Sequence, residues 1–236
     1  MMQFHTHGLT CAMVGLAMTG AAGAETLLFD FGNTGRQTSP GWNNVVPATT
    51  TLFATFDSNN NLTPVGFEIT DTFFQTGEPS QLGTESPSGD AAGYPVDATD
   101  DYFFGHVTAF AGADPNPYGE VKLFNLDPNS TYNFTFFGSR MGVSDIRDAS
   151  YTVTGTNSLN GVLNASNNES EVLRLNGIAP DGNNEIFIGV APGPNNSNGV
   201  GFYYINLVQV DRVIPEPASV GLLGLGGLAL LRRRVA

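Results

Sequence analysis

The stretch that decides the expected fold is residues 120–138, EVKLFNLDPNSTYNFTFFG. Apolar and polar residues alternate in its two halves, Val121–Leu126 and Thr131–Gly138, as they do in half-buried strands. Between them, Asp127 opens a four-residue turn and Pro128 takes the second position, which suits a type I turn. The segment therefore predicts two strands joined by a tight turn.

The second of these strands has two distinct faces. Because side chains alternate across a strand, Tyr132, Phe134 and Phe136 point one way, and we place them in the core. Asn133 and Thr135 point the other way. The run Leu126-Asp-Pro-Asn-Ser-Thr-Tyr132 resembles the L-x-P-x-x-x-Y corner of immunoglobulin-like and fibronectin-like sandwiches, which implies that the Tyr132 hydroxyl bonds back to the turn backbone.

The remaining body also has a β-type pattern. No stretch keeps a helical period, whereas short aromatic and β-branched runs recur between turn clusters. About ten strands result, enough for two packed sheets. We therefore predict an all-β fold, a two-sheet jelly-roll or immunoglobulin-like sandwich. Further strands are expected at Leu27–Gly32, Thr51–Asp57, Leu62–Thr70, Tyr102–Val107, Tyr151–Thr154, Val172–Leu175, Glu185–Val190 and Gly201–Val210.

Loops are expected between these runs. The asparagines of 58–61 tolerate positive φ and predict a hairpin between the second and third runs. Longer loops are expected at Gln75–Asp101, Ala111–Gly119, Gly155–Glu169 and Asn176–Asn184.

The C-terminal residues 213–236 have three parts in fixed order. Pro215-Glu216-Pro217 holds the backbone extended around one carboxylate. An uncharged run follows at 218–231, and then comes the triplet Arg232, Arg233 and Arg234. As a helix the run would be about 21 Å long, against a hydrocarbon core of roughly 30 Å. The expected transmembrane helix is therefore a short one.

This tail resembles the PEP-CTERM sorting signal of Gram-negative bacteria. The resemblance implies export, transient retention in the inner membrane, and processing near Pro215-Glu216-Pro217 by exosortase. The arginine triplet then acts as the membrane stop and sets the orientation, since positive charge stays on the cytoplasmic side. The alternative is an ordinary hydrophobic helix that docks on a core, but such a helix carries polar residues on one face, and this run has no polar face because Ser219 is its single polar residue.

The N-terminal residues predict an export signal, and this completes the expected domain organisation. Residues 9–22 are apolar or small, and Ala22-Gly23-Ala24 fits a signal-peptidase site. The n-region departs from the usual pattern because it contains no Lys or Arg. We expect a helical signal peptide at 1–24, an extracellular β-sandwich at 25–212, and the sorting signal at 213–236. The export translocon and signal peptidase are the implied partners.

Charge and cysteine content narrow the function classes. Between Glu25 and Arg212 there are 21 acidic and six basic residues, a net of 15 negative charges. Such a body repels nucleic acid, which we exclude as a partner. The only cysteine, Cys11, lies in the signal peptide, so the mature body has neither a disulfide nor a Cys metal site.

Three residues are candidate ligand contacts. Arg140 and Arg147 can donate forked hydrogen bonds to a ligand, or they can pair with Asp145 and Asp148 to hold their loop. Trp42 can offer a flat face to a sugar ring, or it can anchor its own loop.

Asp97, Asp100 and Asp101 are candidate Ca²⁺ ligands, because Ca²⁺ collects six to eight oxygens and backbone carbonyls can complete the set. Asp30 and Asp114 are further candidates for the same site. The alternative is a solvated acidic loop, since the spacing does not match an EF-hand.

The expected function is that of an exported protein of the cell surface or exopolysaccharide matrix. Its precursor is anchored in the inner membrane with a periplasmic body, and the body is a structural or glycan-binding module with extracellular polysaccharide as its partner. We expect no enzyme, because no G-x-S-x-G motif occurs and His106 is the only histidine of the mature body. The alternative is a secreted glycan-active hydrolase that uses a carboxylate pair.

Overall fold

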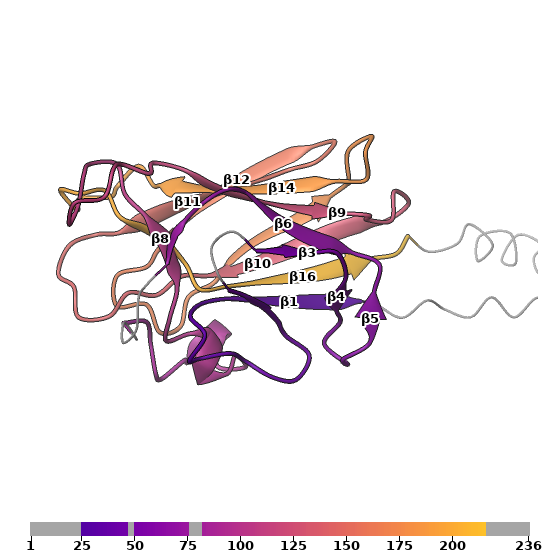
Figure 1. The fold of residues 1–236 in the computed structure, drawn as a ribbon, viewed down its shortest axis with the longest axis horizontal. Helices are drawn as coiled ribbons and strands as arrows, with labels where there is room; N and C mark the ends of the chain where they lie inside the picture. Colours follow the sequence, from indigo (N-terminus) through magenta and orange to yellow (C-terminus); the bar gives the residue numbers. More distant parts are fainter. Residues whose placement is uncertain (1–24, 47–49, 76–81, 216–236) are drawn as a thin grey trace, which may run out of the picture.

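The computed structural model describes residues 25–46, 50–75 and 82–215. These residues form two packed β-sheets with short accessory strands (Figure 1). The signal peptide with its Ala22 and Ala24 site, and the sorting tail from Glu216 to the arginine triplet, lie outside the described residues. No helix within 25–46, 50–75 or 82–215 is long and apolar enough to cross a bilayer.

One sheet has five strands, in the order β13-β10-β16-β1-β2. Its members are β13 (Leu173–Ile178), β10 (Thr131–Phe137), β16 (Leu207–Val213), β1 (Thr26–Phe31) and β2 (Asn43–Val45). The pairs in this sheet are antiparallel except β1 with β2.

The other large sheet has six strands, in the order β12-β11-β14-β9-β6-β3. Its members are β12 (Ser158–Asn164), β11 (Asp148–Thr154), β14 (Ile186–Pro192), β9 (Gly119–Phe124), β6 (Gly66–Asp71) and β3 (Thr51–Leu52).

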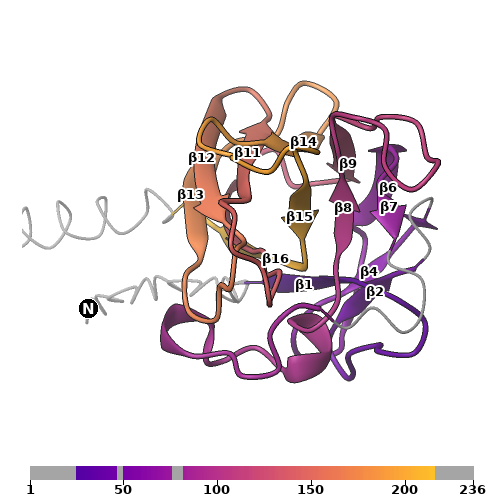
Figure 2. The same cartoon turned by 90° about the vertical axis from the view of Figure 1, so that its left-hand side faces the viewer.

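Two small sheets complete the body. A three-stranded sheet, β15-β8-β7, joins Tyr203–Ile205, Phe103–Gly105 and Phe74–Gln75. Seen from one end, β15 and β8 stand between the two large sheets (Figure 2). The hairpin of β4 (Thr55–Phe56) and β5 (Leu62–Thr63) forms the last pair.

The core lies between the two large sheets. Its aromatic side chains connect the sheets directly: Phe29 of β1 stacks on Phe67 of β6 at 4.9 Å, and Phe136 of β10 lies 4.8 Å from Tyr151 of β11, measured between ring centroids. Burying one such side chain contributes about 2–3 kcal/mol. The predicted inward set of β10, Tyr132, Phe134 and Phe136, is buried here.

The predicted corner is confirmed. The backbone N–H of Asp127 donates to the Tyr132 hydroxyl at 2.9 Å. Ser130 Oγ and the Arg212 guanidinium both donate to Oδ2 of the Asp127 carboxylate. The turn between β9 and β10 is therefore fixed to the end of β16.

The loop before β8 covers the outer face of the five-stranded sheet. It contains two 3-10 turns, η1 (Gly89–Ala91) and η2 (Val96–Ala98), and lies on the side away from the other sheet (Figure 1). Ala91 and Ala98 pack on Phe137 and Leu207, which point outward from β10 and β16. A loop that was expected from composition thus acts as a third layer.

Local details differ from the sequence predictions. The run Thr51–Asp57 is divided between β3 and β4, and Leu62–Thr70 between β5 and β6, although the predicted hairpin turn is present and Asn60 has a φ of 63°. Residues 158–164, predicted as loop, form β12. Four of its seven residues are exposed and only Leu163 is buried, so its pairing with β11 stabilises it rather than any pattern of its own.

Candidate functional site

A groove of about 460 Å³ lies on the outer face of the five-stranded sheet. Its floor consists of outward-facing side chains from three neighbouring strands, and one wall comes from the η1 loop. The lining residues are Asn133 and Thr135 of β10, Arg174 and Asn176 of β13, Gln209 and Asp211 of β16, and Asp90, Gly93 and Tyr94 of the loop.

Strand register aligns the floor. Asn133 pairs with Asp211, and Thr135 pairs with both Gln209 on one side and Arg174 on the other. Paired residues point to the same face of a sheet, so amide, hydroxyl and carboxylate groups stand side by side. The floor is therefore a rigid row of hydrogen-bonding groups.

Hydrogen bonds fix several of these groups. Tyr94 Oη donates to Gln209 Oε1 at 3.0 Å, and Gln209 Nε2 donates to Asp211 Oδ2 at 2.9 Å. Arg174 Nη1 lies 2.7 Å from Asp90 Oδ2 and bridges the sheet to the loop. Burial raises the pKa of Tyr94 to about 12, so its hydroxyl keeps its proton and acts as a donor at neutral pH.

Trp42 supports the groove from behind Tyr94. The indole is half-buried and meets the Tyr94 ring edge to face, with 6.3 Å between centroids. It also packs with the small outer cluster around Phe137 and Leu207. Of the predicted ligand contacts, Trp42 is thus the one beside the groove, and it holds the tyrosine that lines the wall.

Arg140 and Arg147 belong to a different place, the loop between β10 and β11. Arg147 Nε donates to Asp145 Oδ1 at 3.1 Å, and its guanidinium lies 5.3 Å from the centre of the Phe202 ring. It also donates to the Tyr204 hydroxyl. Arg147 therefore holds its loop, as the structural alternative predicts, by pairing with Asp145, one of the two predicted partners.

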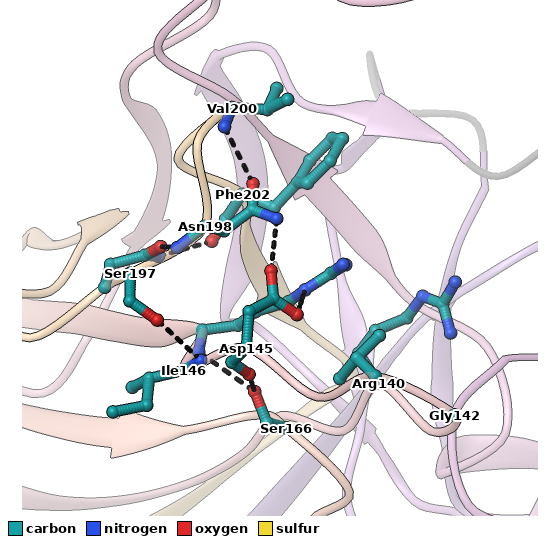
Figure 3. Close-up of polar contacts among 12 residues, drawn as sticks. Arg140, Gly142, Asp145, Ile146, Ser166, Ser197, Asn198, Val200 and Phe202 are labelled. Atoms are coloured by element: carbon teal, nitrogen blue, oxygen red, sulfur yellow. Dashed lines mark hydrogen bonds and ion pairs between the residues drawn. The ribbon is translucent and has the colours of Figure 1, made fainter.

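The same loop is joined to two others by polar contacts (Figure 3). The Asp145 carboxylate accepts from Asn198, and Ser166 Oγ donates to the Asp145 backbone oxygen at 2.6 Å. Arg140 is turned away from Asp145 and donates to the backbone oxygen of Met141. Of the two predicted arginines, Arg140 is thus the one outside the Asp145 network.

The acidic residues come together in an unexpected form. Asp100 and Asp101 are buried after η2, and Asp30 of β1 is buried beside them, whereas the Asp97 side chain is half exposed. Arg36 Nη1 lies 3.1 Å from Asp100 Oδ2 and 3.3 Å from Asp97 Oδ1. Asp114, the fifth candidate, is exposed in the loop before β9.

Few donors reach the three buried carboxylates. Asp101 Oδ2 accepts from the backbone N–H of Asn33 at 2.7 Å, and Asp30 Oδ2 accepts from that of Thr38 at 3.2 Å. The second oxygen of each, and both oxygens of Asp100, are buried without a hydrogen bond, although Asp100 Oδ2 takes part in the ion pair with Arg36. Buried polar atoms in native proteins are nearly always paired, so this cluster is a candidate ligand site.

The electrostatics of this cluster follow from its burial. Desolvation, with the charge of Asp101 added, raises the pKa of Asp30 to about 8. Burial raises the pKa of Asp101 to about 7, against the opposing bond from Asn33, and that of Asp100 to about 6, against the opposing charge of Arg36. The carboxylates therefore favour protons or another cation at neutral pH.

Gly32 makes room for the cluster. A Cβ at this position would lie 2.2 Å from Asp101 Oδ2, so the carboxylate packs directly on the backbone that follows β1. Across residues 25–46, 50–75 and 82–215, no three His, Cys, Asp or Glu side chains converge closely enough to hold a metal by themselves. Any ion here would need backbone or water oxygens as well.

His106 is buried rather than placed in a cleft. It stacks on Phe74 with 4.7 Å between centroids, and Nδ1 lies 2.8 Å from the Thr108 backbone oxygen. The hydrolase alternative relied on an accessible His106 or a carboxylate pair. The groove contains two carboxylates, Asp90 and Asp211, and each already has a partner.

The sequence analysis named none of the lining residues as a site candidate, among them Tyr94, Gln209 and Asp211. A signal for the last two was present, because they alternate with the apolar Val208 and Val210 and so had to point outward from β16. Nothing local indicates that Tyr94 of a long loop would meet Gln209, which lies 115 residues further along the chain.

Several solved structures resemble the fold weakly. The ANXUR1 extracellular domain from Arabidopsis thaliana is 12% identical, with a TM-score of 0.44 over 80% of this chain and 49% of that one. TmCBM61, solved in complex with beta-1,4-galactotriose, is 11% identical, with a TM-score of 0.30 over 61% and 86%. An F5/8 type C domain from Bacteroides fragilis is 17% identical, with a TM-score of 0.28 over 48% and 74%. The chain spans about half the length of the ANXUR1 domain.

No curated protein matches the chain. Its C-terminal segment does match a described family, over residues 213–235, at the point where β16 ends. That family is the PEP-CTERM protein-sorting motif, and it marks the chain as an exported, membrane-anchored precursor whose processing partner is exosortase.

Proposed function

We propose that the body at residues 25–212 is a glycan-binding module of the cell surface or exopolysaccharide matrix, delivered there by its sorting signal. The groove on β10, β13 and β16 would hold the sugar. The observation that carries this proposal is the rigid row of amide, hydroxyl and carboxylate groups on the groove floor, with an aromatic ring at its wall.

Sugars require this combination of groups. Their hydroxyls need donors and acceptors at fixed positions, and charged groups such as Arg174 and Asp211 make the stronger bonds. Their CH faces pack against an aromatic ring such as Tyr94. The net negative charge of the body favours a neutral polysaccharide over an acidic one.

The test is a glycan array followed by affinity electrophoresis in the best polysaccharide. Asn176→Ala removes an exposed amide from the groove on β13, and Asn160→Ala removes an exposed amide from β12 in the other sheet. We expect retardation to weaken for the first variant and to stay unchanged for the second. If the polysaccharide retarded both variants equally, the groove would not be the binding site. If the body bound no glycan on the array, a purely structural role in the matrix would be favoured.

We propose in addition that the buried cluster of Asp30, Asp100 and Asp101 takes up Ca²⁺. All its free atoms are carboxylate oxygens, which suit a hard cation. Two carboxylates would bind at a time, with backbone and water oxygens completing the shell. The cation would neutralise the negative charge of the three carboxylates that the single positive charge of Arg36 does not balance.

Thermal unfolding in Ca²⁺ and in EDTA tests this second proposal. An ion that binds only the folded state raises Tm, by an amount that grows with the logarithm of its concentration above Kd, and Asp101→Asn should abolish that rise. Asp114→Asn is the matched control, since Asp114 is exposed. An identical Tm in Ca²⁺ and EDTA would mean that the cluster holds protons instead.

A further inference from the structure

The described ends of the body lie at one end of the sandwich. β1 and β16 are antiparallel neighbours, and Thr26 at the start of β1 pairs with Asp211 near the end of β16. Arg212 N donates to the Glu25 backbone oxygen at 2.8 Å. In Figure 1, β1 begins and β16 ends at the right-hand side, so the sorting motif starts from that side.

The β4–β5 hairpin stands at this same end (Figure 1). Its backbone is joined to β1, because Ser58 N donates to the Thr26 oxygen at 2.8 Å and Leu27 bridges with Asp57. Leu62 lines a small surface hollow together with Glu25. The hairpin therefore borders the point where the chain continues into the sorting signal.

This hairpin end carries large exposed apolar side chains. Phe53 is 81% exposed, Leu62 68%, and Phe56 and Val213 41% each. Phe56 and Leu62 are directly paired across the hairpin. A monomeric soluble surface rarely groups such residues unless it meets a partner.

The short connection to the sorting tail indicates that this partner is the membrane. Only residues 214–217 separate β16 from the apolar run that starts at Ala218. Fully extended, this connection spans at most about 18 Å. While the tail anchors the precursor, this end of the body is thus held close to the bilayer surface.

We infer that the apolar side chains of Phe53, Phe56 and Leu62 rest in the outer interface of the inner membrane while the precursor is anchored. Aromatic and aliphatic side chains partition into this zone at the depth of the headgroups. Glu25 and Asp57 line the same hollow as Leu62, and their negative charges favour zwitterionic over anionic lipid. This inference rests on anchoring by the sorting motif, and not on the proposed sugar groove.

The experiment uses the full chain, reconstituted through its tail into phosphatidylcholine vesicles. Cys11 is the only cysteine, so Cys11→Ser allows single-cysteine labelling. Leu62→Cys places an environment-sensitive fluorophore on the hairpin, and Val107→Cys places it at the opposite end on a residue that is 42% exposed. Resistance to carbonate extraction reports separately that the tail has inserted.

We expect the probe at position 62 to shift to shorter wavelength and to be quenched by lipid-borne quenchers. The probe at position 107 should show neither change. Phe53→Ser together with Phe56→Ser should reduce the quenching at position 62 while carbonate resistance is kept. An inserted chain with equal, weak quenching at both positions would overturn the inference, and failure to insert would count against the anchoring itself.

Discussion

Two buried tyrosine hydroxyls, one hydrogen-bonded and one without a hydrogen-bond partner, allow a quantitative prediction of thermal stability. The Tyr132 hydroxyl accepts the Asp127 N–H at 2.9 Å and closes the corner between β9 and β10. Tyr132→Phe keeps the ring in the core but deprives that N–H of its partner. A lost bond of this kind costs about 1–1.5 kcal/mol. At about 2–4 °C per kcal/mol for a body of this size, Tm should fall by about 2–6 °C.

The Tyr203 hydroxyl is buried and has no hydrogen-bond partner. It packs over Gly105, where a Cβ would lie only 2.1 Å away. Tyr203→Phe removes a polar atom that burial already penalises. We therefore expect an unchanged or slightly higher Tm from the same chemical substitution.

The assay is urea and thermal unfolding followed by the fluorescence of Trp42 and by circular dichroism. Both variants should unfold with the m-value of the parent protein, which shows that the change lies in the native state. If Tyr203→Phe destabilised the body as much as Tyr132→Phe, hydrogen-bond satisfaction would not be the deciding factor. A Tyr132→Phe variant as stable as the parent would refute the role of the corner.

Four further predictions follow from the aspartate cluster and the tail. In EDTA, the unfolding free energy should fall with rising pH between pH 5 and 7, because folded Asp30 keeps a proton that the unfolded chain has lost, and Asp101 and Asp100 add to the effect below their own raised pKa values. Each retained proton contributes roughly 1.4 kcal/mol per pH unit, so Asp30→Asn should reduce the slope by about that amount in a pH series of unfolding curves. Gly32→Ala should cost about 1–3 kcal/mol in urea unfolding, since its methyl group would overlap the Asp101 carboxylate, and a neutral result would place that carboxylate elsewhere. Replacing Pro215 to Pro217 by alanines should leave unprocessed precursor in the membrane fraction, whereas an unchanged mature mass would remove the motif as the processing signal. Replacing Arg232 to Arg234 by asparagines should weaken membrane retention on fractionation, and normal retention would argue against the assigned orientation.

Local patterns predicted the sandwich because its central strands carry strong alternation. The Tyr132, Phe134 and Phe136 face of β10 follows from a period of two, and the corner was expected from the resemblance of Leu126, Pro128 and Tyr132 to the L-x-P-x-x-x-Y pattern. β12 was missed for the converse reason: it is an edge strand with Gly161 at its centre and one buried side chain, so its sequence reads as a loop. Its pairing with β11 is a tertiary effect.

The sites were harder to predict because they depend on contacts between residues that are far apart in the sequence. The groove floor joins β10, β13 and β16 through a register that no local pattern specifies. The sequence suggested Asp100 and Asp101 as Ca²⁺ ligands with Asp30 as a further candidate, but not that the loop carrying them folds over β1 and buries them beside Asp30. Burial is what makes these carboxylates chemically unusual.

The position of β16 has a mechanical consequence. This strand leads directly into the sorting signal, and it is hydrogen-bonded on both sides, to β10 from Thr131↔Val213 to Phe137↔Leu207 and to β1 from Thr26↔Asp211 to Asp30↔Leu207. Antiparallel hydrogen bonds run perpendicular to the strands, so tension on the tail pulls along β16 and loads both ladders in shear at once. A polymer bound to Gln209 and Asp211 would pull on the same strand. The force between polymer and anchor would then be carried along β16 and not through the other strands.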